Sequence, residues 1–267
     1  SSTSGPFVRF GAHWYFAADD LTHGLELWRS DGTRAGTALF ADLIPGVASG
    51  SPRELTVVGD RLFFAALPNE LWISDGTAAG TQRLASFVQR PPVPFPNLVR
   101  ELTALDGALW FVADDASTGV ELWRSDGTPA GTSLFVDLRP GPNGSFPHEL
   151  TVLGGRLYFS ATTDVLGTEL FFTDGTFPGS GVLDLAPGTA SSFLSELTPF
   201  GDRLYFRAFV NSASAELWTS DGTLAGSQRV SAAPSDVSGL HVAGERLFFQ
   251  AEDAAGREPW VSDGTSA

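Results

Sequence analysis

The sequence predicts an all-β protein, a β-propeller of six blades, each of about four antiparallel strands. A motif of the form E-L-W-x-x-D-G-T, or a close variant, occurs six times along the 267 residues. Successive copies start 44, 51, 48, 47 and 42 residues apart, which is the period of a four-stranded blade. An almost continuously apolar run precedes each copy, and helical periodicity is absent throughout. Repetition, spacing and strand-like pattern therefore indicate the same fold.

The motif copies are ELWRSDGT at 26–33, ELWISDGT at 70–77, ELWRSDGT at 121–128, ELFFTDGT at 169–176, ELWTSDGT at 216–223 and EPWVSDGT at 258–265. Three further segments repeat with the motif and complete a four-strand unit. In the second copy they are ELTVV at 54–58, GDRLFFAAL at 59–67 and TQRLASF at 81–87. Gly-Asp at 59–60 and Asp-Gly in each SDGT are typical of tight hairpin turns with positive φ.

The apolar run Leu62–Ala66 predicts a strand with both faces of its sheet covered. A blade between two neighbouring blades has that property. The predicted blades form a single repeat domain and occupy about 1–46, 47–90, 91–141, 142–188, 189–234 and 235–267. The last blade lacks its final strand, and we expect a closed six-blade ring, with a longer parent array as the alternative.

Composition excludes several function classes. The formal charge is −15, from 31 acidic side chains and 16 basic ones that are all arginine, which disfavours nucleic-acid binding. Such a field attracts cations, so bound Ca²⁺ is possible. The chain has no cysteine, and no apolar stretch approaches the roughly 20 residues of a membrane span. We expect no membrane insertion and no other cofactor, and no signal peptide is visible at the start.

The repeated E-L-W-x-x-D-G-T, followed by G-T and in three copies by D-L-x-P-G, resembles the ELWxxDGT repeat family. Its members are secreted or surface-attached bacterial proteins, sometimes called hyalin-like. The matching residues begin with Glu26, Trp28 and Asp31 and return in the later copies. The resemblance implies an extracellular or cell-surface location and a propeller-like fold, but no reaction. Copies two and five depart from it, with Gln-Arg at 82–83 and 228–229 and no D-L-x-P-G.

A residue present in every copy is expected to shape the blade. The six SDGT aspartates are interpreted as turn-capping residues, with a repeated Ca²⁺ site as the alternative. The ELW glutamates are interpreted as hydrogen-bonding partners between blades. The motif tryptophans are interpreted as packing wedges, although exposed rings could form glycan-stacking platforms.

A unique function is expected where the copies differ. In an up-and-down blade the variable connections emerge at one face and the repeated turns at the other. Loops carried on a rigid scaffold commonly hold binding sites. Phe193 could join the predicted ligand-binding residues of this face, which are Asp19, Asp20, His23, Arg90, Phe95, Asn97, Asp114, Asp115, Phe146 and His148.

No motif points to catalysis. The sequence has no H-E-x-x-H zinc motif, no G-x-S-x-G nucleophile elbow and no glycine-rich phosphate loop. We therefore predict no catalytic residues and an extracellular binding or adhesion module, expected as a monomer, for a glycan or protein partner. A structural element of a longer repeat array is the alternative, and a glycan hydrolase or lyase a weaker one.

Overall fold

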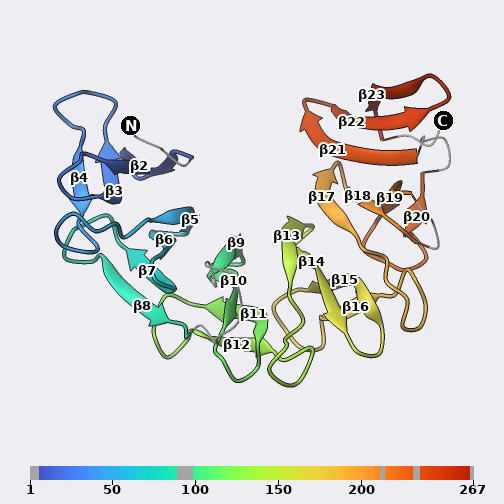
Figure 1. Ribbon diagram of the computed structural model, residues 1–267, viewed down its shortest axis with the longest axis horizontal. Coiled ribbons are helices and arrows are strands. Elements are labelled where there is room, and N and C mark those ends of the chain that lie inside the picture. Colours follow the sequence, from blue (N-terminus) through green and yellow to red (C-terminus); the bar gives the residue numbers. More distant parts are fainter. Residues whose placement is uncertain (1–5, 89–98, 211–213, 231–234, 265–267) are drawn as a thin grey trace. The chain divides into compact units, whose positions relative to one another are not determined.

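The protein is described by a computed structural model that covers residues 6–88, 99–210, 214–230 and 235–264. Within these ranges the chain forms strands β1 to β23 and six antiparallel sheets (Figure 1). Every sheet is a meander, with strands hydrogen bonded in chain order. Five sheets have four strands, and the sixth has three among the described residues. The predicted fold class, an all-β propeller of six blades, is confirmed.

The sheets follow the predicted blade order. Blades 1 to 3 are β1 (Val8–Phe10), β2 (His13–Asp19), β3 (Leu25–Ser30) and β4 (Ala38–Ala41); β5 (Arg53–Val58), β6 (Arg61–Ala66), β7 (Glu70–Ser74) and β8 (Gln82–Ser86); and β9 (Arg100–Leu105), β10 (Ala108–Asp114), β11 (Val120–Ser125) and β12 (Ser133–Val136). Blades 4 to 6 are β13 (His148–Leu153), β14 (Arg156–Thr163), β15 (Gly167–Thr173) and β16 (Gly181–Leu183); β17 (Ser195–Phe200), β18 (Arg203–Ala208), β19 (Glu216–Ser220) and β20 (Gln228–Arg229); and β21 (Ser235–Ala243), β22 (Arg246–Asp253) and β23 (Gly256–Ser262).

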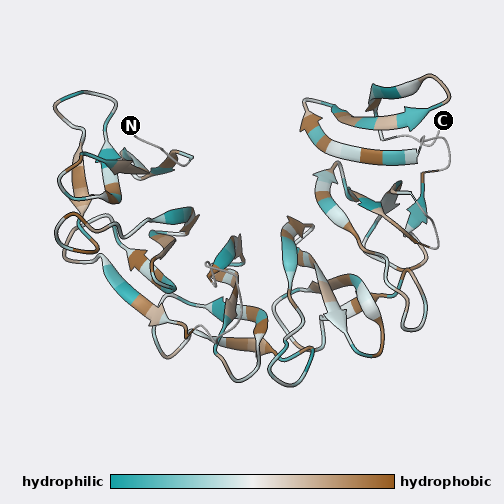
Figure 2. Cartoon of the chain, viewed as in Figure 1, coloured by the Kyte–Doolittle hydropathy of each residue, from teal (hydrophilic) through white to brown (hydrophobic). Residues whose placement is uncertain are grey.

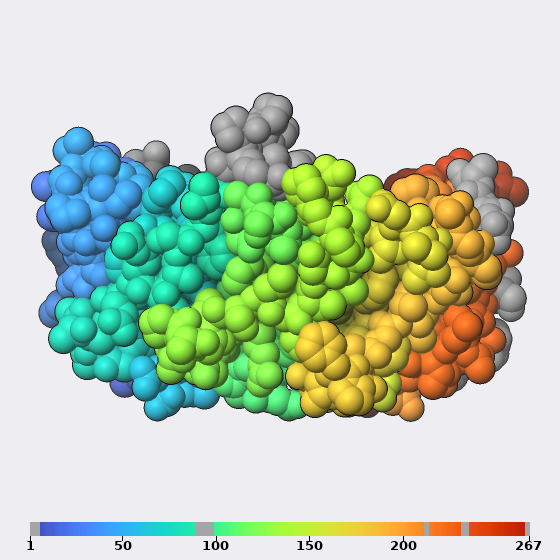
Figure 3. Space-filling view, turned by 90° about the horizontal axis from the view of Figure 1, so that it is seen from below, coloured from blue at the N-terminus to red at the C-terminus, as the bar shows by residue number. Residues whose placement is uncertain are grey.

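The chain divides into two compact units, residues 1–144 and 145–267. The first holds blades 1 to 3 and the second holds blades 4 to 6. Within each unit the copies follow one another in sequence order across the surface (Figure 3). The first strands of successive blades contact each other, β5 with β9 in the first unit and β13 with β17 in the second. These first strands form the inner edge of the blades.

Both predicted hairpin turns are present. Gly59, between β5 and β6, has φ of 58°, and Gly76, in the SDGT turn after β7, has φ of 89°. Residues with a side chain rarely adopt such angles, so glycine there lets the strands reverse without backbone strain. The turns recur in each copy because the glycines recur.

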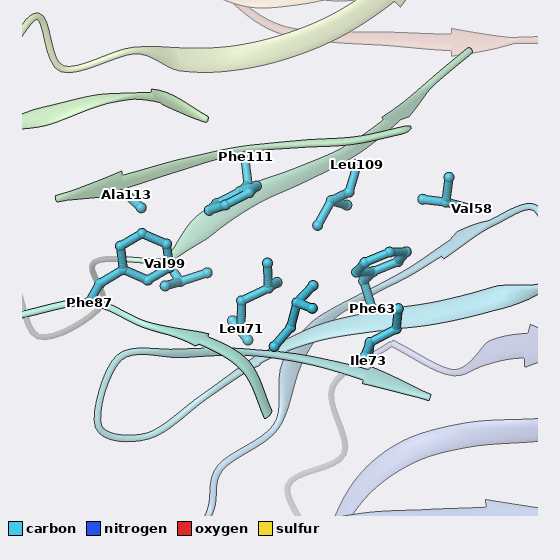
Figure 4. Packing of buried hydrophobic residues seen from close by; sticks show 11 residues of the cluster. Val58, Phe63, Leu71, Ile73, Phe87, Val99, Leu109, Phe111 and Ala113 are labelled. Carbon is cyan, nitrogen blue, oxygen red and sulfur yellow. The ribbon is translucent and has the colours of Figure 1, made fainter. Parts of the chain in front are cut away.

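Apolar residues lie along the strands of every sheet (Figure 2), and the second strand of each blade forms the centre of the packing. All seven residues of β10 are buried, as are all residues of β6 after Arg61. Figure 4 shows the cluster between blades 2 and 3, where Phe63 and Ile73 face Leu109 and Phe111. Full burial of one such side chain contributes about 1.5–3 kcal/mol. The continuous apolar run of β6 is therefore explained by blade 1 on one face and blade 3 on the other.

Blade 6 is different. Residues of β22 alternate between buried and exposed, with Leu247, Phe249 and Ala251 buried and Phe248 and Gln250 exposed. Successive side chains of a strand point to opposite faces of its sheet. One face of β22 packs against blade 5, and the described structure leaves the other face open.

Candidate functional site

Each blade has two ends with different connections. Because the strands run antiparallel in chain order, the hairpins between the first and second and between the third and fourth strands lie together. We call this the turn end. The loop between the second and third strands and the connection to the next blade lie at the opposite end, which we call the loop end. The predicted site residues within the described ranges belong to the loop end.

The repeated aspartate of the turn end caps its own turn. In blade 2 the Asp75 carboxylate accepts hydrogen bonds from the Thr77 backbone N–H at 2.9 Å and from the Thr77 hydroxyl at 2.7 Å. These hydrogen bonds lower the pKa of Asp75. Gly80 lies against the same carboxylate, and any Cβ at this position would overlap it. The same contacts recur in blades 1, 3, 4 and 5, as expected for a structural turn.

The ELW glutamate joins neighbouring blades. In blade 4 the buried Glu169 carboxylate accepts hydrogen bonds from the backbone N–H groups of Leu185, at 2.9 Å, and Ser192, at 3.0 Å. The Ser192 carbonyl in turn accepts one from Phe209 of blade 5, at 2.8 Å. Glu26 holds the matching connection after blade 1. The glutamate therefore fixes the D-L-x-P-G segment and the connection to the next blade, and burial raises its pKa.

Blades 2 and 5 use their glutamate differently, which explains their departure from the repeat. Glu70 forms an ion pair with Arg83 of the neighbouring strand at 2.7 Å, and accepts a hydrogen bond from the Trp72 indole at 2.8 Å. Glu216 forms an ion pair with Arg229 at 3.2 Å. The arginine of the Gln-Arg pair takes the place of the missing D-L-x-P-G backbone as partner of the glutamate.

The sequence pattern did not reveal that a second repeated glutamate connects neighbouring blades. This glutamate lies in the ELT segment of the inner strand. Glu54 has φ of 53° and lies where the pairing of β5 and β6 shifts by a bulge. The bulge turns its carboxylate toward the next blade, where it accepts a hydrogen bond from the Leu102 N–H at 3.0 Å. Glu149 and Glu196 do the same in the second unit. The available signal was a charged residue recurring in a short inner strand.

The first predicted loop, residues 19–24, is folded around its own carboxylates. Asp19 accepts a hydrogen bond from the Leu21 N–H at 2.7 Å, and Asp20 accepts those of Thr22 and His23 at 2.9 Å. The His23 ring pairs with the second Asp20 oxygen at 2.8 Å. Through these contacts the pKa of Asp20 falls to about 2 and that of His23 rises. Asp20 and His23 are brought together as an exposed pair.

The second predicted loop, residues 114–119, repeats this structure in blade 3. Asp114 accepts a hydrogen bond from the Ala116 N–H at 2.7 Å, and Asp115 accepts those of Ser117 and Thr118 at 2.8 and 2.9 Å. Asp114 is buried. The four predicted aspartates therefore all shape their own loops. Arg90, Phe95 and Asn97 lie outside the described residues.

The connections at the loop end share one unusual backbone position. Ser51, Phe146, Phe193 and Asp236 occupy it in four blades, with φ of 50°, 52°, 42° and 54°. Non-glycine residues at positive φ cost of order 1 kcal/mol and cluster at functional sites. The Phe146 carbonyl lies 3.1 Å from the His148 ring nitrogen, so these two predicted residues are in contact. Phe193 is 61% exposed.

The backbone at Phe193 lies next to the end of the strand that carries Arg207 and leads to Phe209. Phe193 follows Ser192, whose carbonyl binds the N–H of Phe209. The Arg207 guanidinium lies 5.3 Å from the centre of the Phe209 ring, and 3.8 Å from a Glu196 carboxylate oxygen. Its buried Nε has no hydrogen-bond partner among the described residues. We call Phe193, Arg207 and Phe209 the loop-end cluster of the second unit.

The motif tryptophans pack between blades. Trp123 meets the Phe87 ring edge-on at 5.1 Å, and Trp72 stacks on Phe64 at 6.1 Å. Both are partly buried against apolar clusters. These contacts support the packing interpretation over an exposed glycan platform.

The free face of blade 1 carries a hollow of about 350 Å³ lined by Phe7, Trp14, Ser30 and Gly32. Among the described residues, no three His, Asp or Glu side chains are close enough together to hold a metal ion. The described residues also contain no helix with the length and apolarity needed to cross a membrane.

Comparison with known proteins supports the fold alone. No family model and no curated protein matches the chain. Among solved structures, the computationally designed Ika8 protein matches all of this chain and 73% of its own, with a TM-score of 0.51 and 14% identity. BamB from Moraxella catarrhalis matches 96% of this chain and 71% of its own, with a TM-score of 0.49 and 14% identity. The putative TolB from Agrobacterium tumefaciens matches 77% of this chain and 70% of its own, with a TM-score of 0.46 and 13% identity.

Proposed function

We propose that the chain is a binding or adhesion module, secreted or on the cell surface, that holds an extracellular glycan or protein at the loop end of its blades. At the turn end, the recurring side chains make hydrogen bonds that shape the blade. At the loop end, the ELW glutamates hold the connections rigidly while the side chains on those connections differ from copy to copy. A rigid backbone with variable side chains is suited to recognition. The proposal assigns no catalytic residue.

The observation that carries the proposal is the exposed ring of Phe193. Its backbone is held at positive φ by a connection that hydrogen bonds to both Glu169 and Phe209. The equivalent residue in blade 2 is Ser51, so the fold does not require an aromatic ring there. An exposed aromatic ring can stack on a sugar face or on an aromatic side chain of a protein.

A glycan array probed with the intact chain, with Ca²⁺ and again with EDTA, tests this function. The Phe193→Ser variant takes its residue from the equivalent position of blade 2 and leaves the connection intact. We expect it to lose at least about tenfold in affinity, the loss of a central aromatic anchor. The matched control is Leu224→Ser, which removes an exposed apolar side chain at the turn end of the same unit.

Equal loss in both variants, or binding unaffected by Phe193→Ser, would reject the loop-end cluster as the site. Absence of glycan binding would leave a protein partner or a structural role, and cross-linking from position 193 on the source cell surface would distinguish these two. A second candidate function, a structural element that assembles with further blades, is favoured by the open faces of blades 1 and 6.

A further inference from the structure

The blades inside each unit meet through one recurring contact. The middle residue of the second-strand motif packs on the glycine of the SDGT turn in the next blade. A Cβ on Gly127 would lie 3.2 Å from Ile73 and 3.5 Å from Phe63, and one on Gly264 would lie 3.1 Å from the Tyr205 hydroxyl oxygen. We call this glycine and the apolar residues around it, here Gly127 with Leu109 and Phe111, the socket. We call the pair on the preceding blade that packs against it, here Phe63 and Ile73, the knob.

Both sides of this contact are apolar. In the example between blades 2 and 3, the knob residues Phe63 and Ile73 are paired across β6 and β7. They share a buried cluster with Leu109 and Phe111 of the socket side, against which Trp123 also packs (Figure 4). Every blade carries a knob on one face and a socket on the other, because successive residues of a strand alternate between faces.

Blade 6 presents a knob without a socket. Phe248 and Val261 occupy the positions of Phe63 and Ile73, and they are paired across β22 and β23 in the same way. Phe248 is 42% exposed and Val261 52% exposed, whereas Phe63 is 1% exposed. This apolar pair is therefore open to solvent in the second unit.

Blade 1 presents a socket without a knob. Trp14 occupies the position of Leu109 and is 42% exposed, whereas Leu109 is fully buried. A Cβ on Gly32, the SDGT glycine of this blade, would have no described atom within 4 Å. Trp14 and Gly32, with Phe7 and Ser30, line the hollow of about 350 Å³.

We propose that the knob of blade 6 docks into the socket of blade 1 of a second copy of this chain, so that copies associate head to tail. The chain carries both halves of an interface that its own blades form repeatedly. A contact between two different faces is heterologous and propagates into open chains or closes into rings of copies. The proposed association differs from the monomer expected from the sequence.

The contact is expected to be reversible and to strengthen with salt. Gln250 and Pro259 stand where the knob face of blade 2 has Ala65 and Leu71, so part of the apolar surface is missing. Each copy also carries a net charge of −15, and copies repel one another until salt screens the charge. A hydrophobic contact opposed by like charge therefore tightens as ionic strength rises.

Sedimentation velocity over a concentration series tests the proposal, with two variants that place a charge on each half: Trp14→Asp and Phe248→Asp. Both side chains are partly exposed, and near-ultraviolet circular dichroism checks that each variant folds. We expect wild type to form oligomers whose size grows with concentration. Each variant alone should be monomeric over the same range, and the two variants mixed should form a 1:1 dimer, because each retains the face that the other lacks.

Phe177→Asp is the matched control, an exposed ring of the second unit at the turn end of blade 4, and it should associate like wild type. A wild type that stays monomeric at every concentration and salt would overturn the proposal. A monomer whose Trp14 fluorescence responds to Phe248→Asp would instead show that both faces are occupied within one chain. Association that Phe177→Asp abolishes and Trp14→Asp does not would assign it to another surface.

Discussion

Replacing Glu169 by alanine tests whether the ELW glutamate holds neighbouring blades together. Its two oxygens accept hydrogen bonds from the N–H groups of Leu185 and Ser192 at 2.9 and 3.0 Å. Hydrogen bonds to a charged group contribute about 1.5–3 kcal/mol each, and a buried donor left without a partner costs a similar amount. The cost of burying the charged carboxylate offsets part of the stability that these hydrogen bonds contribute. We therefore expect Glu169→Ala to lower the free energy of unfolding by about 3–5 kcal/mol.

Glu169→Gln retains one oxygen acceptor and should cost about half as much. Its cost should also depend on pH. Burial raises the pKa of Glu169 in the folded protein above 4.5, so the stability linked to its proton is present below pH 4.5 and is lost as the pH rises. The glutamine does not titrate, so the difference from wild type should shrink as the pH rises through this range.

Urea denaturation measures the total cost, and amide hydrogen exchange locates it. In Glu169→Ala the amides of Leu185 and Ser192 should exchange faster than in wild type. Glu245→Ala, at an exposed position in a hairpin of the same unit, is the matched control. If Glu169→Ala is no more destabilising than Glu245→Ala, or leaves both amides protected, the glutamate does not join the blades.

Two further predictions concern pairs of residues. In a nuclear magnetic resonance titration, Asp20→Asn should bring the raised pKa of His23 back toward 6.5. In the wild type the ion pair should be strongest between about pH 4 and 6.5, where Asp20 is ionised and His23 is protonated. A His23 pKa that the substitution leaves unchanged would contradict the contact. Gly80→Ala should lower the free energy of unfolding by about 2–4 kcal/mol, because the new Cβ overlaps the Asp75 carboxylate. Adding Asp75→Ala should recover part of that loss. Strictly additive changes in the free energy of unfolding would show that the overlap is not the cause.

Repetition made the fold predictable from the sequence. The signals of the first three strands and their turns were present in every copy, so a degenerate segment such as GLHVA at 239–243 could be aligned with its intact counterparts. The apolar run at 62–66 correctly indicated cover on both faces, because alternation along a strand reports how many faces are wet. The exposed residues of β22 follow the same rule, since only one of its faces is covered in the described structure.

The candidate site was only partly predictable. The Asp-Asp pairs of the loops at 19–24 and 114–119 read as exposed ligands, yet each carboxylate hydrogen bonds to its own loop. Sequence shows which residues are polar, but not which backbone N–H they satisfy. Arg207 lies within a strand motif, and its pairing with Ser195 depends on the bulge between β17 and β18, which no local pattern reveals.

The glutamate of the inner strand also bears on how such a chain can change its length. The ELT segment at 196–198 offers its Glu196 carboxylate to the following copy and its Leu197 N–H to Glu149 of the preceding one. Duplicating a whole copy of this kind therefore recreates the same inner-strand hydrogen bond at the new junction. Lineages can gain such copies by recombination without evolving a new inner-strand junction, whereas removing half a copy would leave a partly buried glutamate without its backbone donor.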